Sequence, residues 1–113
     1  MTVSPVDLDG PVHRTGPQWG MQSGDLNATL LAWPAGGSVA EHRNDEIDVL
    51  IVVLHGSATI RVDGVDNQLA THELLLVPRG STRAVTAGAD GVRYLSVHRR
   101  REPLLPVRRL AGP

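Results

Sequence analysis

The chain has 113 residues, enough for one domain with its own hydrophobic core but too few for two. It contains no cysteine, which excludes disulfides and thiolate metal sites, and its formal net charge of -1 argues against a dedicated nucleic-acid binder. No N-terminal segment resembles a signal peptide, and no stretch approaches the ~20 apolar residues of a membrane span. We therefore expect a cytoplasmic protein with neither a nucleic-acid nor a membrane partner.

Residues 1–26 carry prolines and glycines without a sustained hydrophobic period, which predicts an N-terminal arm or extended lead-in. From residue 27 the chain consists of short β-favouring stretches separated by turn signals. Strands are expected at 27–33, 38–42, 49–54, 58–62, 65–69, 74–77, 82–86 and 92–98. The pair Asp63-Gly64 indicates a two-residue hairpin. Residues 99–113, which are rich in arginine and proline, are expected to form an irregular tail.

Many short strands at a spacing of roughly ten residues, with no helical period, indicate an all-β antiparallel sandwich or barrel. The stretch 49–54 is apolar at both parities, so neither face of this strand is polar. One parity comprises Val49, Ile51 and Val53, and the other comprises Leu50, Val52 and Leu54. In a barrel one of these faces points outward, and an exposed apolar patch usually marks an interface. We therefore expect a homodimer that covers this face with the help of the arm and Trp19; the alternative is a monomer in which the arm or tail folds over it.

The polar segment before this strand crowds titratable side chains against the predicted core. Its polar members are His42, Asn44, Asp45, Glu46 and Asp48. Because an unpaired charge beside a core is costly, Asp48 is expected to have a partner. Histidine suits acid–base chemistry, since its ordinary pKa near 6.5 lies close to working pH. This junction is the predicted site of any chemistry, although a solvated acidic turn and a hydrogen-bonded histidine explain the same residues.

Glycine and histidine recur around this junction at a recognisable spacing. Gly36 is followed after five residues by His42, Asn44 stands two residues later, and Gly56 closes the segment. The pattern resembles the first motif of the small single-domain cupins, G-x5-H-x-H-x3-4-E-x6-G, with Asn44 in place of the second histidine. The motif's glutamate falls on Val49 if four residues separate it from Asn44, and on Asp48 if three residues do. The second choice needs a bulge in the next strand.

The second cupin motif, G-x5-P-x-G-x2-H-x3-N, has a partial counterpart further along the chain. Pro78 and Gly80 match it, whereas His72 stands at the opening glycine and Arg83 at the histidine. The resemblance covers residues 27–98 and implies a double-sheet jelly-roll β-barrel between the arm, 1–26, and the tail, 99–113. It also implies that Arg83 points into the barrel, where it either pairs with Asp48 or binds an anionic ligand.

Cupins that hold a divalent metal such as iron, manganese, zinc or nickel use both histidines and the glutamate of the first motif and the histidine of the second. A guanidinium has no lone pair to donate and cannot ligate a metal. Its positive charge would also repel a divalent cation placed beside it. We therefore expect a degenerate metal site. An alternative set of His42 with Glu46, Asp48 or His98 stays open, because residues 42, 46 and 48 share parity if the chain is extended there.

These residues favour a cupin that binds a small polar or anionic organic molecule in its barrel. Arg83, Asp48 and Asn44 are the candidate ligand-binding residues, and His42 is the candidate acid or base. Two alternatives stay open: a divalent-metal-dependent enzyme of the oxygenase or isomerase type, and a structural or regulatory dimer without activity. The sequence identifies neither the substrate nor the reaction.

Overall fold

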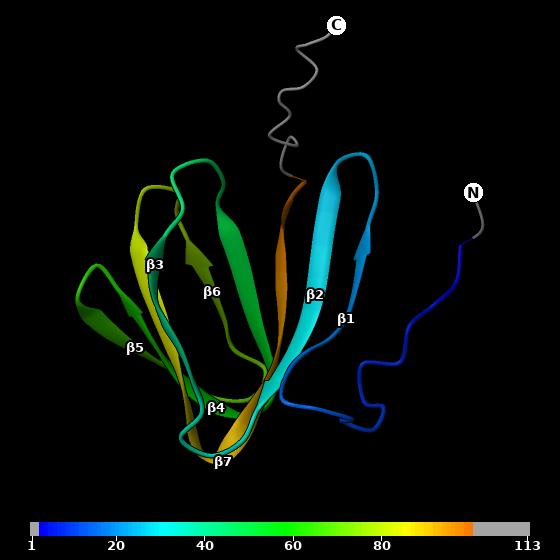
Figure 1. Cartoon of the computed structure of the whole chain (residues 1–113), viewed down its shortest axis with the longest axis horizontal. Coiled ribbons are helices and arrows are strands. Elements are labelled where there is room, and N and C mark those ends of the chain that lie inside the picture. The colour runs from blue at the N-terminus through cyan, green and yellow to red at the C-terminus, as the bar shows by residue number, and fades with distance from the viewer. Residues whose placement is uncertain (1–2, 101–113) are drawn as a thin grey trace, which may run out of the picture.

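The structure is a computed structural model that describes residues 3–100, and within this range it contains seven strands and no helix. The strands are β1 (Gly16–Gln22), β2 (Leu26–Trp33), β3 (Ser38–Arg43), β4 (Val49–Val62), β5 (Val65–Leu69), β6 (Leu74–Val77) and β7 (Thr82–Arg99). All strand pairs are antiparallel (Figure 1). The described part of the chain has no helix long and apolar enough to cross a membrane.

The two long strands β4 and β7 run through both halves of the barrel. The beginning of β4 pairs with β6 and with the end of β7, whereas the end of β4 pairs with β5 and with the beginning of β7. β2 and β1 extend the first half, and β3 joins β7 in the second half. In Figure 1 the halves stand on either side of the region labelled β4 and β7. This arrangement confirms the predicted all-β, double-sheet jelly-roll barrel.

Two of the predicted turns lie inside long strands. Residues 55–57 do not end a strand, because β4 continues through them with register shifts on both sides of Gly56. Residues 88–91 likewise lie within β7. A glycine therefore marks a bend and a bulge here, which is a common use of glycine in barrels. Separate strands at 49–54 and 58–62, and at 82–86 and 92–98, were the wrong interpretation.

The arm also contains a strand that the sequence pattern did not indicate. β1 lies within residues 1–26 and pairs with β2 along its whole length, with Met21 opposite Ala28. The predicted strands near 27–33, 38–42, 65–69 and 74–77 are present, and the Asp63-Gly64 hairpin joins β4 to β5. The tail prediction falls almost entirely on residues 101–113, which lie outside the described residues.

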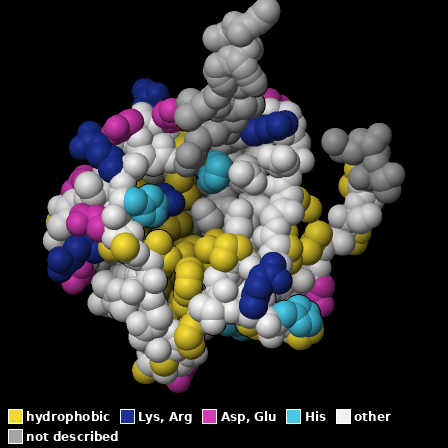
Figure 2. Space-filling model, viewed as in Figure 1, with side chains coloured by type: hydrophobic (Ala, Val, Ile, Leu, Met, Phe, Trp, Pro, Cys, Tyr) yellow, Lys and Arg dark blue, Asp and Glu magenta, His cyan; other side chains and the backbone are white. Residues whose placement is uncertain are grey.

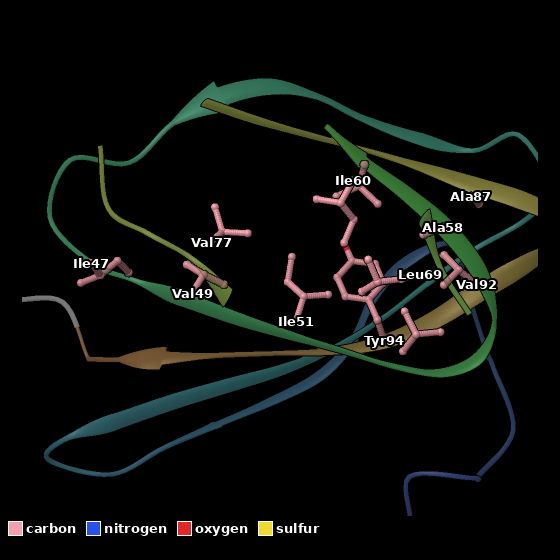
Figure 3. Packing of buried hydrophobic residues seen from close by; sticks show 12 residues of the cluster. Ile47, Val49, Ile51, Ala58, Ile60, Leu69, Val77, Ala87, Val92 and Tyr94 are labelled. Atoms are coloured by element: carbon pink, nitrogen blue, oxygen red, sulfur yellow. The ribbon is translucent and has the colours of Figure 1, made fainter. Parts of the chain in front are cut away.

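The core lies between the inward faces of the two halves. Val49, Ile51 and Val53 are almost completely buried, so the first parity set of β4 faces inward. They pack with residues of the second half and with Tyr94 of β7 (Figure 3). Since successive side chains of a strand point to opposite faces, Leu50, Val52 and Leu54 face outward, and all three are half-buried.

The outward face of the first half carries two apolar rows that run across five strands. Residues opposite each other in neighbouring strands lie side by side on one face. The first row is Leu76, Leu50, Val97, Ala28 and Met21, and the second is Leu74, Val52, Leu95, Leu30 and Trp19. We call these ten residues the outer apolar face. Leu74 and Leu76 are more than half exposed, whereas Leu30 is buried.

Candidate ligand site in the barrel

Arg83 and His42 lie opposite each other on the inward face of the second half. Arg83 is in β7 and has the parity of Val85 and Ala87, which are buried in the core. Its partner in β3 is His42, so the two side chains share one face. Arg83 is half-buried and His42 is exposed, which places them where the core gives way to solvent. In the space-filling view the same face is hollowed, with hydrophobic side chains at its floor and histidine at its rim (Figure 2).

Tyr94 provides a hydroxyl group at the core side of this site. It is 4% exposed, and its ring lies among core side chains with the hydroxyl directed toward Ile60 (Figure 3). Trp33 Nε1 donates a long hydrogen bond of 3.4 Å to this oxygen. Burial raises the pKa of Tyr94 above its ordinary value near 10, while the Trp33 hydrogen bond and the positive charge of Arg83 act weakly in the opposite direction. The phenol is therefore protonated at neutral pH and keeps one O–H to donate.

The ring of His42 is oriented by its own strand. Its Nδ1 lies 3.2 Å from the carbonyl oxygen of Ala40. Because a carbonyl only accepts, Nδ1 is the nitrogen that carries hydrogen in this contact, and in the neutral ring Nε2 is the acceptor. This tautomer is the one that a general base acting through Nε2 needs.

Asn44 and Asp48 use their side-chain oxygens to hold turns. Asn44 Oδ1 accepts hydrogen bonds from the backbone N–H groups of Glu46, at 2.9 Å, and Ile47, at 3.3 Å. Asp48 Oδ1 accepts one at 2.8 Å from the backbone N–H of Arg79. The first contact forms an Asx turn before β4, and the second holds the turn between β6 and β7. Asp48 thus has a backbone amide as a hydrogen-bond partner, and its suggested pairing with Arg83 stays a prediction.

The alternative metal set is not assembled. Within residues 3–100, no three side chains of histidine, aspartate or glutamate come together in a way that could hold a metal ion. Glu46 and Asp48 are both exposed, and the carbonyl of Glu46 accepts a hydrogen bond from Arg99. The residues at the family's ligand positions do not fit a metal either, because Arg83 cannot ligate and Asn44 uses its side-chain oxygen in the turn.

Sequence reasoning missed Tyr94 and Trp33 as members of this site. Both lie in predicted strands, and Tyr94 is the only tyrosine of the chain. A hydroxyl-bearing aromatic residue among aliphatic core residues usually has a polar partner, and this was the available signal. Its partner could not be identified, since Trp33 and Tyr94 are 61 residues apart in the chain.

Comparison with known proteins identifies the fold. No protein-family model matches the sequence, and no curated protein matches it. A conserved protein of unknown function from Streptococcus pyogenes is similar in structure, with a TM-score of 0.72 and 20% identity over 91% of this chain and 92% of that chain. A cupin superfamily protein from Desulfitobacterium hafniense has a TM-score of 0.63 and 27% identity over 72% of both chains. An RmlC-like cupin from Shewanella frigidimarina has a TM-score of 0.65 and 19% identity over 74% of this chain and 75% of that chain.

Proposed function

We propose that this chain, which is a small cupin by its fold, binds a small organic anion in the mouth of its barrel. The observation that carries the proposal is the half-buried position of Arg83, which lies opposite His42 and shares the parity of buried Val85 and Ala87. The proposal does not require Arg83 to lack other partners, because a guanidinium has five N–H donors and can serve two acceptors at once.

Arg83 is the group that would bind the negative charge. Charge-assisted hydrogen bonds from a guanidinium to a carboxylate are about twice as strong as neutral ones and are often bidentate. The apolar floor below Arg83 lowers the local dielectric constant, which strengthens such a contact. Tyr94 is protonated at neutral pH and adds one O–H donor on the core side.

His42 would complete the site from β3. Its Nε2 accepts a hydrogen bond or a proton, so it suits a ligand that carries a hydroxyl or a protonated group next to its carboxylate. The two roles of His42, binding and proton transfer, use the same atom. Asn44 and Asp48 stay outside this proposal, since their side-chain oxygens hold the turns that flank the site.

The experiment that tests the proposal is a thermal-shift series with acetate, malonate and citrate. We expect at least one of these anions to raise the melting temperature of the wild-type protein and to lose this effect in Arg83→Met. The matched control is Arg43→Met, because Arg43 lies next to His42 in β3 but pairs with Asp45 in solvent. Both variants remove one positive charge, so only a specific site distinguishes them.

Two results would contradict this proposal. If Arg83→Met responds to the anions as the wild type does, Arg83 does not bind them. If Arg43→Met loses the response equally, the effect comes from net charge and not from the barrel. In either case the alternative of a structural or regulatory dimer with a filled barrel would be favoured.

The outer apolar face supports the further proposal that the cupin works as a homodimer. Its two rows continue without a polar residue from β6 to β1, and Leu74 and Leu76 at one edge are exposed. A two-fold dimer is the simplest closed assembly that covers such a face on both copies. The competing occupant is the chain's own arm, since Val3 and Ser4 line a groove with Met21 and Val97 at the other edge.

A further inference from the structure

A second cleft lies between the arm, the end of β2 and the bends of β4 and β7. Its volume is about 480 Å³, which falls in the range of about 300–1,000 Å³ that is usual for small-molecule sites. Residues 12–15 of the arm form one wall, and the end of β2 with Trp33 forms another. His55 and Arg93 come from the bends, and we call this site the arm cleft.

Side chains from the barrel hold the arm in place beside this cleft. Arg93 Nη1 donates a hydrogen bond of 2.9 Å to the carbonyl oxygen of Leu8. The ring of His55 contacts the carboxylate of Asp9. Both contacts connect the arm to strands that lie more than 40 residues away in the sequence, as the separation of 46 residues between Asp9 and His55 shows. These contacts hold the arm a few residues before the wall that residues 12–15 form.

Positive charge dominates the lining of the arm cleft. Arg14 donates to the carbonyl oxygens of Pro17, at 2.8 Å, and Gln18, at 3.0 Å, and Arg93 donates to that of Leu8. Among the described residues neither guanidinium forms an ion pair with a carboxylate. Carbonyl contacts orient the two groups without neutralising them, and each keeps further N–H donors. Asp90 is the one carboxylate among the lining residues.

Trp33 adds a flat apolar wall to these charges. The six-membered part of its indole ring packs against Gly16, where a Cβ would lie 3.5 Å from the ring. Buried Ala32 and Val92 lie beside it in the lining. Cationic donors beside an aromatic wall are the features that recognise an anionic group attached to a ring.

We propose that the arm cleft binds a small organic anion, whose phosphate or carboxylate is held by Arg14 and Arg93 and whose ring lies against Trp33. This site shares Trp33 with the barrel site but has other cations, because Arg83 and His42 are not among its lining residues.

The test is calorimetric titration of the full-length protein with phenyl phosphate at low ionic strength, where screening of exposed charges is weak. Inorganic phosphate tests the anionic group alone, and phenol tests the ring alone. We expect phenyl phosphate to bind more tightly than either. Arg93→Gln and Arg14→Gln should each weaken its binding about tenfold, as expected for one lost charge-assisted contact.

Two further variants make the result decisive. Arg61→Gln removes one charge from the other half of the barrel, where Arg61 pairs with Asp66, and should leave binding unchanged. Arg83→Met removes the barrel-mouth arginine and should also leave it unchanged. The proposal is overturned if phenyl phosphate does not bind, or if both cleft variants bind it as tightly as the wild type does. It is also overturned if Arg61→Gln weakens binding as much as the cleft variants do, or if Arg83→Met alone abolishes binding. Arg14→Gln keeps the test valid if Arg93→Gln loosens the arm.

Discussion

Gly56 closes the first motif and lies against the backbone of β7, so replacing it by alanine tests the bend of β4 that lines the arm cleft. Its φ of 74° is in the left-handed region. A Cβ added there would lie 2.9 Å from the carbonyl carbon of Gly91 and 3.2 Å from the Cα of Val92. Both neighbours are backbone atoms of β7, which cannot move aside as a flexible side chain can. The alanine variant must therefore strain its own dihedral angles and also push two paired strands apart.

The expected loss can be worked out from these two effects. A left-handed φ costs an L-residue ~1–2 kcal/mol, and a methyl group forced into packed backbone costs ~1–3 kcal/mol. Reduced freedom of the unfolded chain returns ~0.4–1 kcal/mol. The free energy of unfolding should therefore fall by about 1–4.5 kcal/mol. For a domain of this size that corresponds to a melting temperature lower by on the order of 5–20 °C.

Gly36→Ala is the matched control for this experiment. Gly36 has a φ of 75°, but a Cβ there would meet no atom within 4 Å. The free energy of unfolding of this variant should fall by about 0.5–1 kcal/mol, because only the dihedral angle is strained. Urea denaturation followed by tryptophan fluorescence measures both variants. Equal losses in the two variants would refute the reasoning, because the close approach of β4 and β7 would then contribute nothing.

Three other predictions concern the site and the assembly. Tyrosinate absorbance, which reports the chain's one tyrosine, should show Tyr94 titrating above pH 10 in the folded protein. Because the pKa is higher in the folded than in the unfolded chain, Tyr94 contributes stability that is complete below about pH 10 and is lost as the pH rises through the folded pKa. A midpoint at or below that of the unfolded chain would contradict this. Purified protein should contain sub-stoichiometric transition metal by elemental analysis, and about one iron, zinc, manganese or nickel per chain, lost in His42→Ala, would show the opposite. Light scattering at micromolar concentration should give twice the mass of one chain. The measured mass should fall in the Val52→Glu variant but not in the Thr59→Glu variant. A mass of one chain throughout a dilution series would exclude the dimer.

Where one local pattern was enough, the sequence determined the structure. The Asp63-Gly64 pair predicts a hairpin because both residues tolerate a positive φ, and both have one. The two parity sets of residues 49–54 predict two apolar faces because side chains alternate along a strand, and one set is buried while the other is half-buried. The resemblance implies that Arg83 points into the barrel, and Arg83 shares the parity of the buried residues Val85 and Ala87. The division of the chain at residue 27 stays a prediction, although β1 already belongs to the sheet.

Only the tertiary structure decided which distant groups meet. A glycine can end a strand or let it bend, and Gly56 bends β4 because the backbone of β7 passes too close for a side chain. β1 has no pattern of its own and becomes a strand because β2 offers it a paired edge. Asn44 and Asp48 bond to whichever backbone N–H the fold brings near, so their residue types could not distinguish a ligand site from a turn. Tyr94 and Trp33 come together for the same reason: side-chain partners across a barrel are set by strand register, which sequence separation does not reveal.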